Sequence, residues 1–282
     1  MSTSIEARRL GRAARQVERE VENSRWLDWL ARAGLAAKGA SYALVGVLAI
    51  KVAIGDGGKA TSRQGALASI AHHSYGEVLL VALAIGFAGY ALWRFAQTFF
   101  DKSNEGSGPK GLALRGGYFG RGLIYAGLTV ITVRLLTQAD EPRPQNQQAH
   151  EKTAMVLSWP AGRWIVGIAG ACLVAAGLYN GYRGVTKKFL ERWQSGSSYE
   201  APKWGARAGV LGLLARMVVF GLIGVFLIKA AYDYDPRDAI GLDGALLKLA
   251  HHAFGSWLLG AVAAGLLAYA VFCAFEARYR RI

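Results

Sequence analysis

The chain has 282 residues, of which 53% are hydrophobic and 18% are charged. A soluble domain of this size usually carries about 25% charged residues, so the composition favours a membrane protein. The net charge is +14, but the basic residues stand between long apolar stretches rather than in one stripe, which argues against nucleic acid as a partner. Cys172 and Cys273 lie inside apolar runs, which indicates packing rather than a disulfide framework or a thiolate metal site.

The first 31 residues predict a basic amphipathic helix on the cytoplasmic side of a membrane. Apolar side chains recur there at helical spacing between five arginines from Arg8 to Arg19. A helix of this kind lies on an anionic leaflet, which makes anionic lipid a predicted partner and this helix the candidate contact with a partner protein. The alternative interpretation is a solvated basic tail.

Six apolar segments follow, each long enough to cross about 30 Å of hydrocarbon at about 1.5 Å per residue. They occupy 33–54, 75–99, 117–136, 164–182, 210–231 and 253–275. All are rich in Gly and Ala, which lets helix backbones approach closely in lipid. The predicted fold class is therefore all-α, a polytopic membrane protein with six transmembrane helices.

The distribution of basic residues predicts the orientation, because Lys and Arg near helix ends are retained in the cytoplasm. With the N-terminus inside, the inner segments hold 23 basic residues and the outer loops hold ten. The acidic residues divide almost evenly, with ten inside and nine outside. We therefore expect a multi-pass protein of the cell (inner) membrane with both termini in the cytoplasm.

The six segments group into three tandem two-helix repeats. The repeats occupy 32–100, 115–190 and 204–282. The linkers between them, 101–114 and 191–203, contain the Gly, Ser and Pro typical of flexible cytoplasmic connections.

The outer connections differ from one another in character. The stretch 138–148 is polar and interrupted by proline, which predicts an exposed outer loop. The segments 61–72 and 238–251 each predict a short amphipathic helix in the outer interface, with Thr61 and Asp238 as candidate N-caps. A re-entrant course through the membrane is the alternative.

The first helix of every repeat carries one pattern. A basic residue is followed by an aromatic residue four positions later and by a second basic residue thirteen positions after the first. The matching sets are Lys38, Tyr42 and Lys51; Arg121, Tyr125 and Arg134; and Arg216, Phe220 and Lys229. In the first and third copies Gly46 and Gly224 also coincide.

The second helices agree as well. A histidine pair, His72–His73 or His251–His252, begins eighteen residues before Tyr90 or Tyr269. The middle copy lacks the histidines, although Tyr179 keeps its place. Small residues and tyrosines at repeated positions indicate packing between helices. The residues assigned to packing are Gly46, Gly86, Tyr90, Tyr125, Tyr179, Gly224, Gly265 and Tyr269.

These motifs, together with an Arg-x-Gly start to each repeat, resemble the bacterial membrane family catalogued as domain of unknown function 1206. The Arg-x-Gly starts are Arg32 to Gly34, Arg115 to Gly117 and Arg207 to Gly209. The resemblance covers about 29–280 and implies an integral membrane protein in three two-helix copies, without an assigned activity. Because each copy crosses the membrane twice, we predict a pseudo-threefold arrangement about the membrane normal.

The six repeated basic residues allow three interpretations, the third of which is the binding of anionic lipid. Thirteen residues separate the two alpha-carbons of a pair by about 19.5 Å, so long side chains place their charges near the two headgroup levels. The first interpretation makes Lys38, Arg121 and Arg216, and their outer counterparts Lys51, Arg134 and Lys229, anchors at the membrane interface. The second makes them inner and outer rings of an anion pathway. At about 100° per residue, the two residues of one helix face different directions, so both rings cannot easily face one axis.

The histidines His72, His73, His251 and His252 are the candidate metal ligands, since they share the outer side. Neighbouring residues on a helix point about 100° apart, so each pair offers at most one ligand, and we predict no metal site. The sequence has no nucleotide-binding loop, nucleophile elbow or haem-attachment motif, and therefore predicts neither enzyme activity nor a cofactor.

The sequence predicts a non-enzymatic membrane module that binds lipid or protein. The alternative is a small channel or carrier that conducts an anion through a passage between the three hairpins. No Asp or Glu lies well inside any of the six segments, which argues against coupling to protons or cations.

Overall fold

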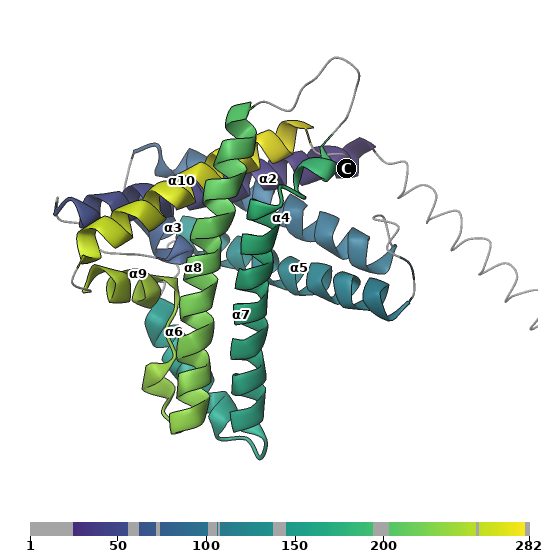
Figure 1. The fold of residues 1–282 in the computed structure, drawn as a ribbon. Helices are drawn as coiled ribbons and strands as arrows, with labels where there is room; N and C mark the ends of the chain where they lie inside the picture. The colour runs from purple at the N-terminus through teal and green to yellow at the C-terminus, as the bar shows by residue number, and fades with distance from the viewer. Residues whose placement is uncertain are drawn as a thin grey trace, which may run out of the picture.

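The computed structural model describes residues 25–55, 62–71, 74–100, 106, 108–137, 145–193, 203–251 and 254–279. The predicted N-terminal amphipathic helix lies almost entirely outside these ranges. Across the described residues the chain is helical with short connections (Figure 1). The long helices are α2 (Arg25–Ala53), α4 (Gly76–Phe99), α5 (Pro109–Leu136), α7 (Gly162–Val185), α8 (Lys203–Asp233) and α10 (Gly255–Tyr279).

The prediction of an all-α chain with six long apolar helices is confirmed, because each of these helices is long and apolar enough to cross a membrane. Shorter helices occupy the connections. They are α3 (Arg63–Ala71), α6 (Gln145–Leu157) and α9 (Leu242–Ala250), with two 3-10 turns, η1 (Leu190–Arg192) and η2 (Pro236–Asp238). The outer loop predicted at 138–148 is wrong at its end, because α6 already begins at Gln145.

The first helix of each copy begins earlier than its apolar segment does. Helices α2, α5 and α8 start at Arg25, Pro109 and Lys203, seven or eight residues before the predicted segments. Hydropathy detects apolar side chains, whereas helical hydrogen bonding continues through polar residues as well. The repeated basic residue of each copy therefore lies about 18–20 Å inside its helix, at about 1.5 Å per residue.

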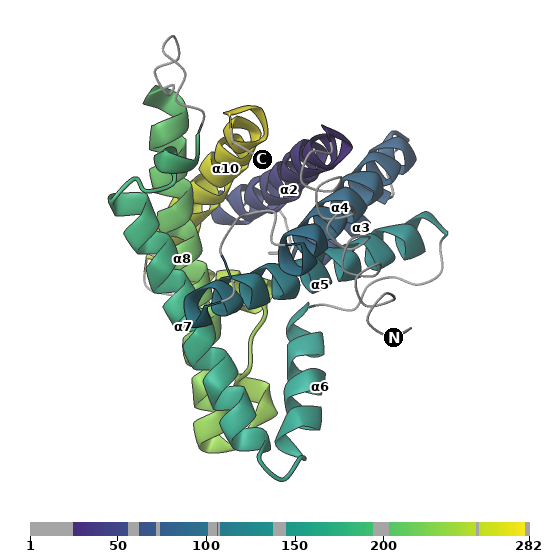
Figure 2. The same cartoon turned by 90° about the vertical axis from the view of Figure 1, so that its right-hand side faces the viewer.

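The six long helices pack as three pairs, and each pair joins two different copies. Helix α4 packs against α5, α7 against α8, and α10 returns to pack against α2. Within a copy, α2 also packs against α4 and α8 against α10. The pair α7 and α8 runs upright in Figure 1, whereas α4 and α5 run across it (Figures 1 and 2). The pairing follows the repeat, but the pseudo-threefold arrangement about a membrane normal remains a prediction.

Glycines at repeated positions bring the pairs between copies together. A Cβ added at Gly46 would lie 2.8 Å from the side chain of Leu267 on α10, and one at Gly224 would lie 2.7 Å from the carbonyl oxygen of Gly170 on α7. The backbones therefore approach more closely than larger side chains would allow. Both glycines join the first helix of their copy to the second helix of the preceding copy.

In two of the pairs, an arginine of the first helix binds carbonyls at the C-terminal end of its partner helix. Arg32 on α2 donates from Nη1 to the carbonyl oxygens of Ala277 and Arg278, both at 2.9 Å. Arg115 on α5 donates from Nε to the carbonyl oxygen of Thr98 at 2.7 Å. A guanidinium at a helix C-terminus satisfies carbonyls that have no partner inside the helix and complements the helix dipole.

The third Arg-x-Gly start is out of register with the other two. Arg32 and Arg115 stand six residues before the repeated basic residue, whereas Arg207 stands nine before Arg216 and Val210 occupies the equivalent place. Arg207 lies beside the ring of Trp204 at 5.3 Å. The Arg-x-Gly motif therefore groups Arg207 with Arg32 and Arg115, although Arg207 contacts an aromatic ring and the other two bind helix carbonyls.

The short helices α3, α6 and α9 are linked across copies by polar side chains. The backbone N–H of Asn146 in α6 donates to the buried carboxylate of Asp243 in α9 at 3.1 Å. Gln148 of α6 donates to Gln64 of α3 at 2.9 Å. The N-cap of α9 is Gly241 rather than Asp238, and Thr61 lies outside the described residues.

The start of the second linker packs into the core. Phe189 and Trp193 are both buried, and their rings lie 5.0 Å and 6.2 Å from the ring of Phe272 on α10. Aromatic contacts of this kind add to the burial of apolar surface. The chain around η1 is therefore fixed against the inner end of α10.

Candidate functional site

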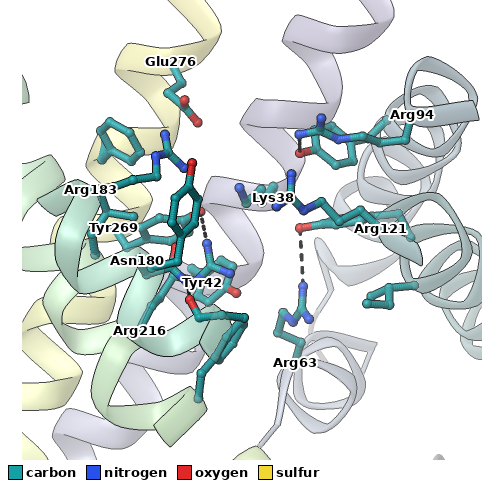
Figure 3. A pocket seen from close by; sticks show the side chains of 18 residues that line it. Lys38, Tyr42, Arg63, Arg94, Arg121, Asn180, Arg183, Arg216, Tyr269 and Glu276 are labelled. Carbon is teal, nitrogen blue, oxygen red and sulfur yellow. Dashed lines mark hydrogen bonds between the residues drawn. The ribbon is translucent and has the colours of Figure 1, made fainter. Parts of the chain in front are cut away.

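A cavity of about 220 Å³ lies between the three helix pairs (Figure 3). Helices α2, α4, α5, α7, α8 and α10 all contribute to its walls, and α3 contributes one arginine. The polar side chains that line it are Lys38, Tyr42, Arg63, Tyr90, Arg94, Arg121, Tyr125, Tyr179, Asn180, Arg183, Arg216, Tyr269 and Glu276. Six of these are basic, and most of the others are tyrosines.

The repeat explains how the basic residues meet. Lys38, Arg121 and Arg216 hold the same position in α2, α5 and α8, about thirteen residues after each helix begins. Because each of these helices also packs against the preceding copy, the three side chains reach the cavity from three sides (Figure 3). The aromatic residue four positions later lies one helical turn away and lines the same cavity in each copy.

The ammonium group of Lys38 lies between two tyrosine rings. Its Nζ is 5.0 Å from the ring centroid of Tyr269 and 6.0 Å from that of Tyr90. Among the described residues, no hydrogen-bond acceptor or carboxylate contacts this Nζ. Aromatic faces stabilise a cation only in part, so Lys38 retains the capacity to bind an anion.

Arg216 is held by aromatic side chains. Its Nη1 donates a hydrogen bond to the hydroxyl of Tyr269, and its guanidinium lies 4.6 Å and 4.7 Å from the rings of Tyr269 and Phe220. The buried Nε of Arg216 has no hydrogen-bond partner within the described part of the chain. A buried donor without a partner is costly, which favours a ligand that accepts from it.

Arg94 and Arg63 are positioned in the same way. Arg94 donates to the hydroxyl of Tyr90 and to Oε1 of Gln97 at 2.7 Å, while its buried Nε has no partner in the described ranges. Arg63 of α3 donates to the hydroxyl of Tyr125 at 3.4 Å. Tyrosines therefore fix the guanidinium groups without neutralising them.

Arg121 has the least support of the basic side chains. Its guanidinium lies 6.0 Å from the ring of Tyr118, and it makes no hydrogen bond or ion pair with any described residue. It lines the cavity and is exposed. Together with Lys38, it supplies two cations whose charge the described protein groups leave uncompensated.

One carboxylate, that of Glu276, lines the cavity among the residues that the structure describes. Glu276 is buried near the C-terminal end of α10. Among the described lining residues, six basic side chains against one acidic side chain leave a strong positive charge between six long apolar helices. Charges inside membrane-spanning segments usually mark ligand or ion sites, because burial without compensation is expensive. The chemistry of this lining suits an anion.

The structure separates the two sets of repeated basic residues. Lys38, Arg121 and Arg216 line the cavity, so their interpretation as interface anchors is replaced by one in which they face the interior. The outer counterparts are exposed and do not line it; they are Lys51, Arg134 and Lys229. The expectation that the two rings cannot face one axis agrees with this placement.

Near the C-terminal end of α8, Lys229 has carboxylate partners. Its Nζ lies 2.7 Å from Oδ1 of Asp238 and 3.2 Å from Oδ2 of Asp233. The hydrogen bond from Lys229 lowers the pKa of Asp238 below its usual value. These exposed contacts are typical of surface ion pairs rather than of a binding site.

The packing residues fall into two groups. Tyr90, Tyr125 and Tyr269 are buried at the cavity wall, whereas Tyr179 lines the cavity but is 54% exposed. Gly86 and Gly265 lie at close contacts between helices of one copy: a Cβ added there would lie 2.5 Å and 2.4 Å from the Cβ atoms of Ala37 and Ala215.

Sequence reasoning missed Arg63, Arg94 and Arg183. A signal for two of them was present, because Arg94 and Arg183 each stand four residues after the repeated tyrosine, at Tyr90 and Tyr179. The third copy has Cys273 at that place. No comparable repeat points to Arg63, since α9 has Leu242 at the position equivalent to it.

Of the four histidines, His251 alone lies within the described residues. It is exposed and follows the last residue of α9. His72, His73 and His252 lie outside the described ranges. Within those ranges, no group of three or more His, Cys, Asp or Glu side chains is placed to hold a metal ion.

The comparisons agree with the threefold repeat. A family described as Domain of Unknown Function (DUF1206) matches residues 33–101, 116–187 and 211–280, and the repeated basic residue is the sixth residue of each match. The chain is also 30% identical over 262 residues to "Uncharacterized protein YxxB" of Bacillus subtilis (strain 168), covering 93% of this chain and 94% of that one. No solved structure matches.

Proposed function

We propose a function from the geometry of the cavity. The chain belongs to the family Domain of Unknown Function (DUF1206), whose description assigns no activity. The protein binds an anionic ligand in the basic cavity between its helix pairs. The observation that carries this proposal is that Lys38 and Arg121 line the cavity without an acceptor among the described residues. The proposal assigns binding and no catalytic step.

The arrangement of donors supports an oxyanion as the ligand. Arginine presents several N–H donors in one plane, which suits the oxygens of phosphate and carboxylate groups. The Nε atoms of Arg94 and Arg216 are buried and without partners in the described chain. Tyrosine hydroxyls hold these guanidinium groups in place, so the site needs little reorganisation on binding.

In the proposed orientation, part of the cavity lining lies toward the cytoplasmic side of the membrane. Arg94, Arg183 and Glu276 lie near the C-terminal ends of α4, α7 and α10, which the proposed topology places toward the cytoplasm. Setting aside the five inner and one outer basic residues that line the cavity leaves 18 inner basic residues against nine outer ones. The proposed cytoplasmic position of both termini therefore keeps its support. Reporter fusions at the two termini measure this directly.

A ligand-induced shift in thermal stability tests the proposal. The protein is purified in a neutral detergent and in phosphatidylcholine nanodiscs, and the two probes are inorganic phosphate and phosphatidic acid. A ligand present at a hundred times its dissociation constant stabilises a folded protein by about 2.7 kcal/mol. We expect at least one of the two probes to raise the melting temperature of the wild type.

The control variants come from the same repeat. Arg216→Gln and Lys38→Gln should weaken binding at least tenfold, whereas Lys51→Gln and Arg134→Gln, which remove exposed charges outside the cavity, should leave it unchanged. Equal losses in the two groups would mean that general surface charge is responsible. Absence of a shift with both probes would also reject the proposal.

The alternative of an anion channel or carrier requires a path from the cavity to the outer face. Lys51, Arg134 and Lys229 do not line the cavity, and Arg63 of α3 is the one basic residue of the predicted outer connections that does so among the described residues. We therefore favour binding. The predicted protein partner of the N-terminal helix concerns residues outside the described ranges and stays a prediction.

A further inference from the structure

The middle copy differs from the other two in how its own two helices meet. In the first copy a Cβ added at Gly34 of α2 would lie 2.3 Å from the Cβ of Tyr90 on α4. In the third copy a Cβ at Gly212 of α8 would lie 2.5 Å from the Cα of Tyr269 on α10. A Cβ added at the equivalent glycine of the middle copy, Gly117 on α5, would meet no atom of another element within 4 Å.

A second repeated contact is open at the same place. In the first and third copies, Gly86 and Gly265 on the second helix meet alanines of the first helix. In the middle copy the glycine is on the first helix, as Gly120 of α5, and the alanine is on the second, as Ala175 of α7. A Cβ added at Gly120 would meet no atom of another element within 4 Å, and Ala175 is exposed. Among the described residues, α5 and α7 make almost no close backbone approach. The small residues needed for contact are present, but the two helices are apart.

This gap opens onto the basic cavity. Arg121 and Ile124 on α5, and Tyr179 and Asn180 on α7, line the cavity from the two sides of the gap. Ile124 and Tyr179 are each 54% exposed. The gap therefore has charged groups inside and apolar or amphipathic side chains at its mouth.

The surroundings of the gap indicate what can pass through it. Both α5 and α7 are long and apolar enough to span a membrane, and each exposes large apolar side chains, including Leu123 and Leu178. A free ion reaching the cavity by this route would have to cross hydrocarbon, which is very unfavourable. A lipid can place its charged headgroup inside while its acyl chains stay in the bilayer.

We infer that the ligand is the phosphate headgroup of a membrane lipid, which enters sideways between α5 and α7. This inference rests on the proposed function. The headgroup oxygens accept from Lys38, Arg121 and Arg216, and the acyl chains leave past Ile124 and Tyr179. Phosphate is shared by lipids and by the free ion, so the route through the gap distinguishes the two sources.

Photo-crosslinking locates the acyl chains. Phosphatidic acid with a diazirine in its acyl chain is incorporated into phosphatidylcholine nanodiscs, and crosslinked residues are identified by mass spectrometry. We expect crosslinks on α5 and α7 beside the gap, reduced at least tenfold in Arg216→Gln. Crosslinks spread over all six helices, or unaffected by Arg216→Gln, would overturn the inference.

Closing the gap gives a matched test. Gly120→Trp fills open space at the mouth, whereas Val130→Trp adds the same side chain at an exposed position of α5 that does not line the cavity. We expect Gly120→Trp to weaken phosphatidic acid binding at least tenfold and to change the stabilisation by inorganic phosphate less than twofold. Val130→Trp should match the wild type.

The outcomes separate the two proposals. If inorganic phosphate binds the wild type as tightly as phosphatidic acid, or if Gly120→Trp leaves lipid binding unchanged, the lipid inference fails while anion binding stands. If Arg216→Gln weakens the binding of neither inorganic phosphate nor phosphatidic acid, the proposed function itself fails.

Discussion

Replacing equivalent glycines by alanine should affect the three copies in different ways. Gly212 on α8 lies against the backbone of Tyr269, and an added Cβ would be about 1 Å short of ordinary contact with its Cα. Because the obstacle is backbone, α8 and α10 must move apart as bodies. Gly117 holds the same place on α5, where an added Cβ meets nothing within 4 Å.

The expected change in folding stability is the sum of two opposing contributions. Overpacking of this kind costs about 1–3 kcal/mol, and a contact that involves backbone belongs near the upper end. Alanine in place of glycine favours a helix interior by about 1 kcal/mol. The net loss for Gly212→Ala is therefore about 2 kcal/mol, whereas Gly117→Ala should be neutral or stabilising by about 1 kcal/mol.

Thermal unfolding in detergent, followed by tryptophan fluorescence at a fixed scan rate, measures the difference. At about 2–4 °C per kcal/mol for a chain of this size class, Gly212→Ala should lower the melting temperature by about 4–8 °C. Gly34→Ala in the first copy should behave like Gly212→Ala, and Gly117→Ala should not fall below the wild type. A loss for Gly117→Ala as large as that for Gly212→Ala would refute the reasoning, because it would mean that the middle hairpin is closed like the others.

Two further predictions use other contacts. Arg115→Ala removes the hydrogen bond to the carbonyl oxygen of Thr98 and should lower the melting temperature by the equivalent of about 1 kcal/mol, whereas Arg207→Ala, which removes no such cap, should match the wild type in the same scan. Because Lys229 lowers the pKa of Asp238, that contact stabilises the fold above the unfolded pKa of the carboxyl group and is lost as pH falls through the folded one. Melting temperatures of the wild type and Asp238→Asn, measured from neutral pH down to pH values near that lowered pKa, should therefore converge in acid; a gap that widens in acid would contradict this.

The local properties of the fold are readable from the sequence. In a membrane, long apolar segments must satisfy their backbone hydrogen bonds internally. The segment 33–54 and the five other apolar segments were therefore predicted to be helices. The repeat of Lys38, Arg121 and Arg216 also identified three equivalent copies. The 100° step between residues of a helix predicted that these cations and their outer counterparts cannot easily face one axis.

The tertiary structure alone decided which of the two sets of cations lies inside. Both satisfy the same sequence pattern, and long side chains at either position can reach an interface. Only the pairing of each first helix with the second helix of the preceding copy, α10 against α2 included, turns Lys38, Arg121 and Arg216 toward a common space. Arg63 joins them through the folding of α3 against α2, α4 and α5, which no local signal encodes.

The open middle copy is a second property that sequence could not supply. Gly117, Gly120 and Tyr179 repeat the small and aromatic residues that pack tightly in the other copies. Whether they meet depends on the direction in which α7 and α8 run together, and that direction is set by their packing against each other and of α8 against α10. Sequence determines which surfaces can pack, whereas the balance among all the packed surfaces determines which of them do.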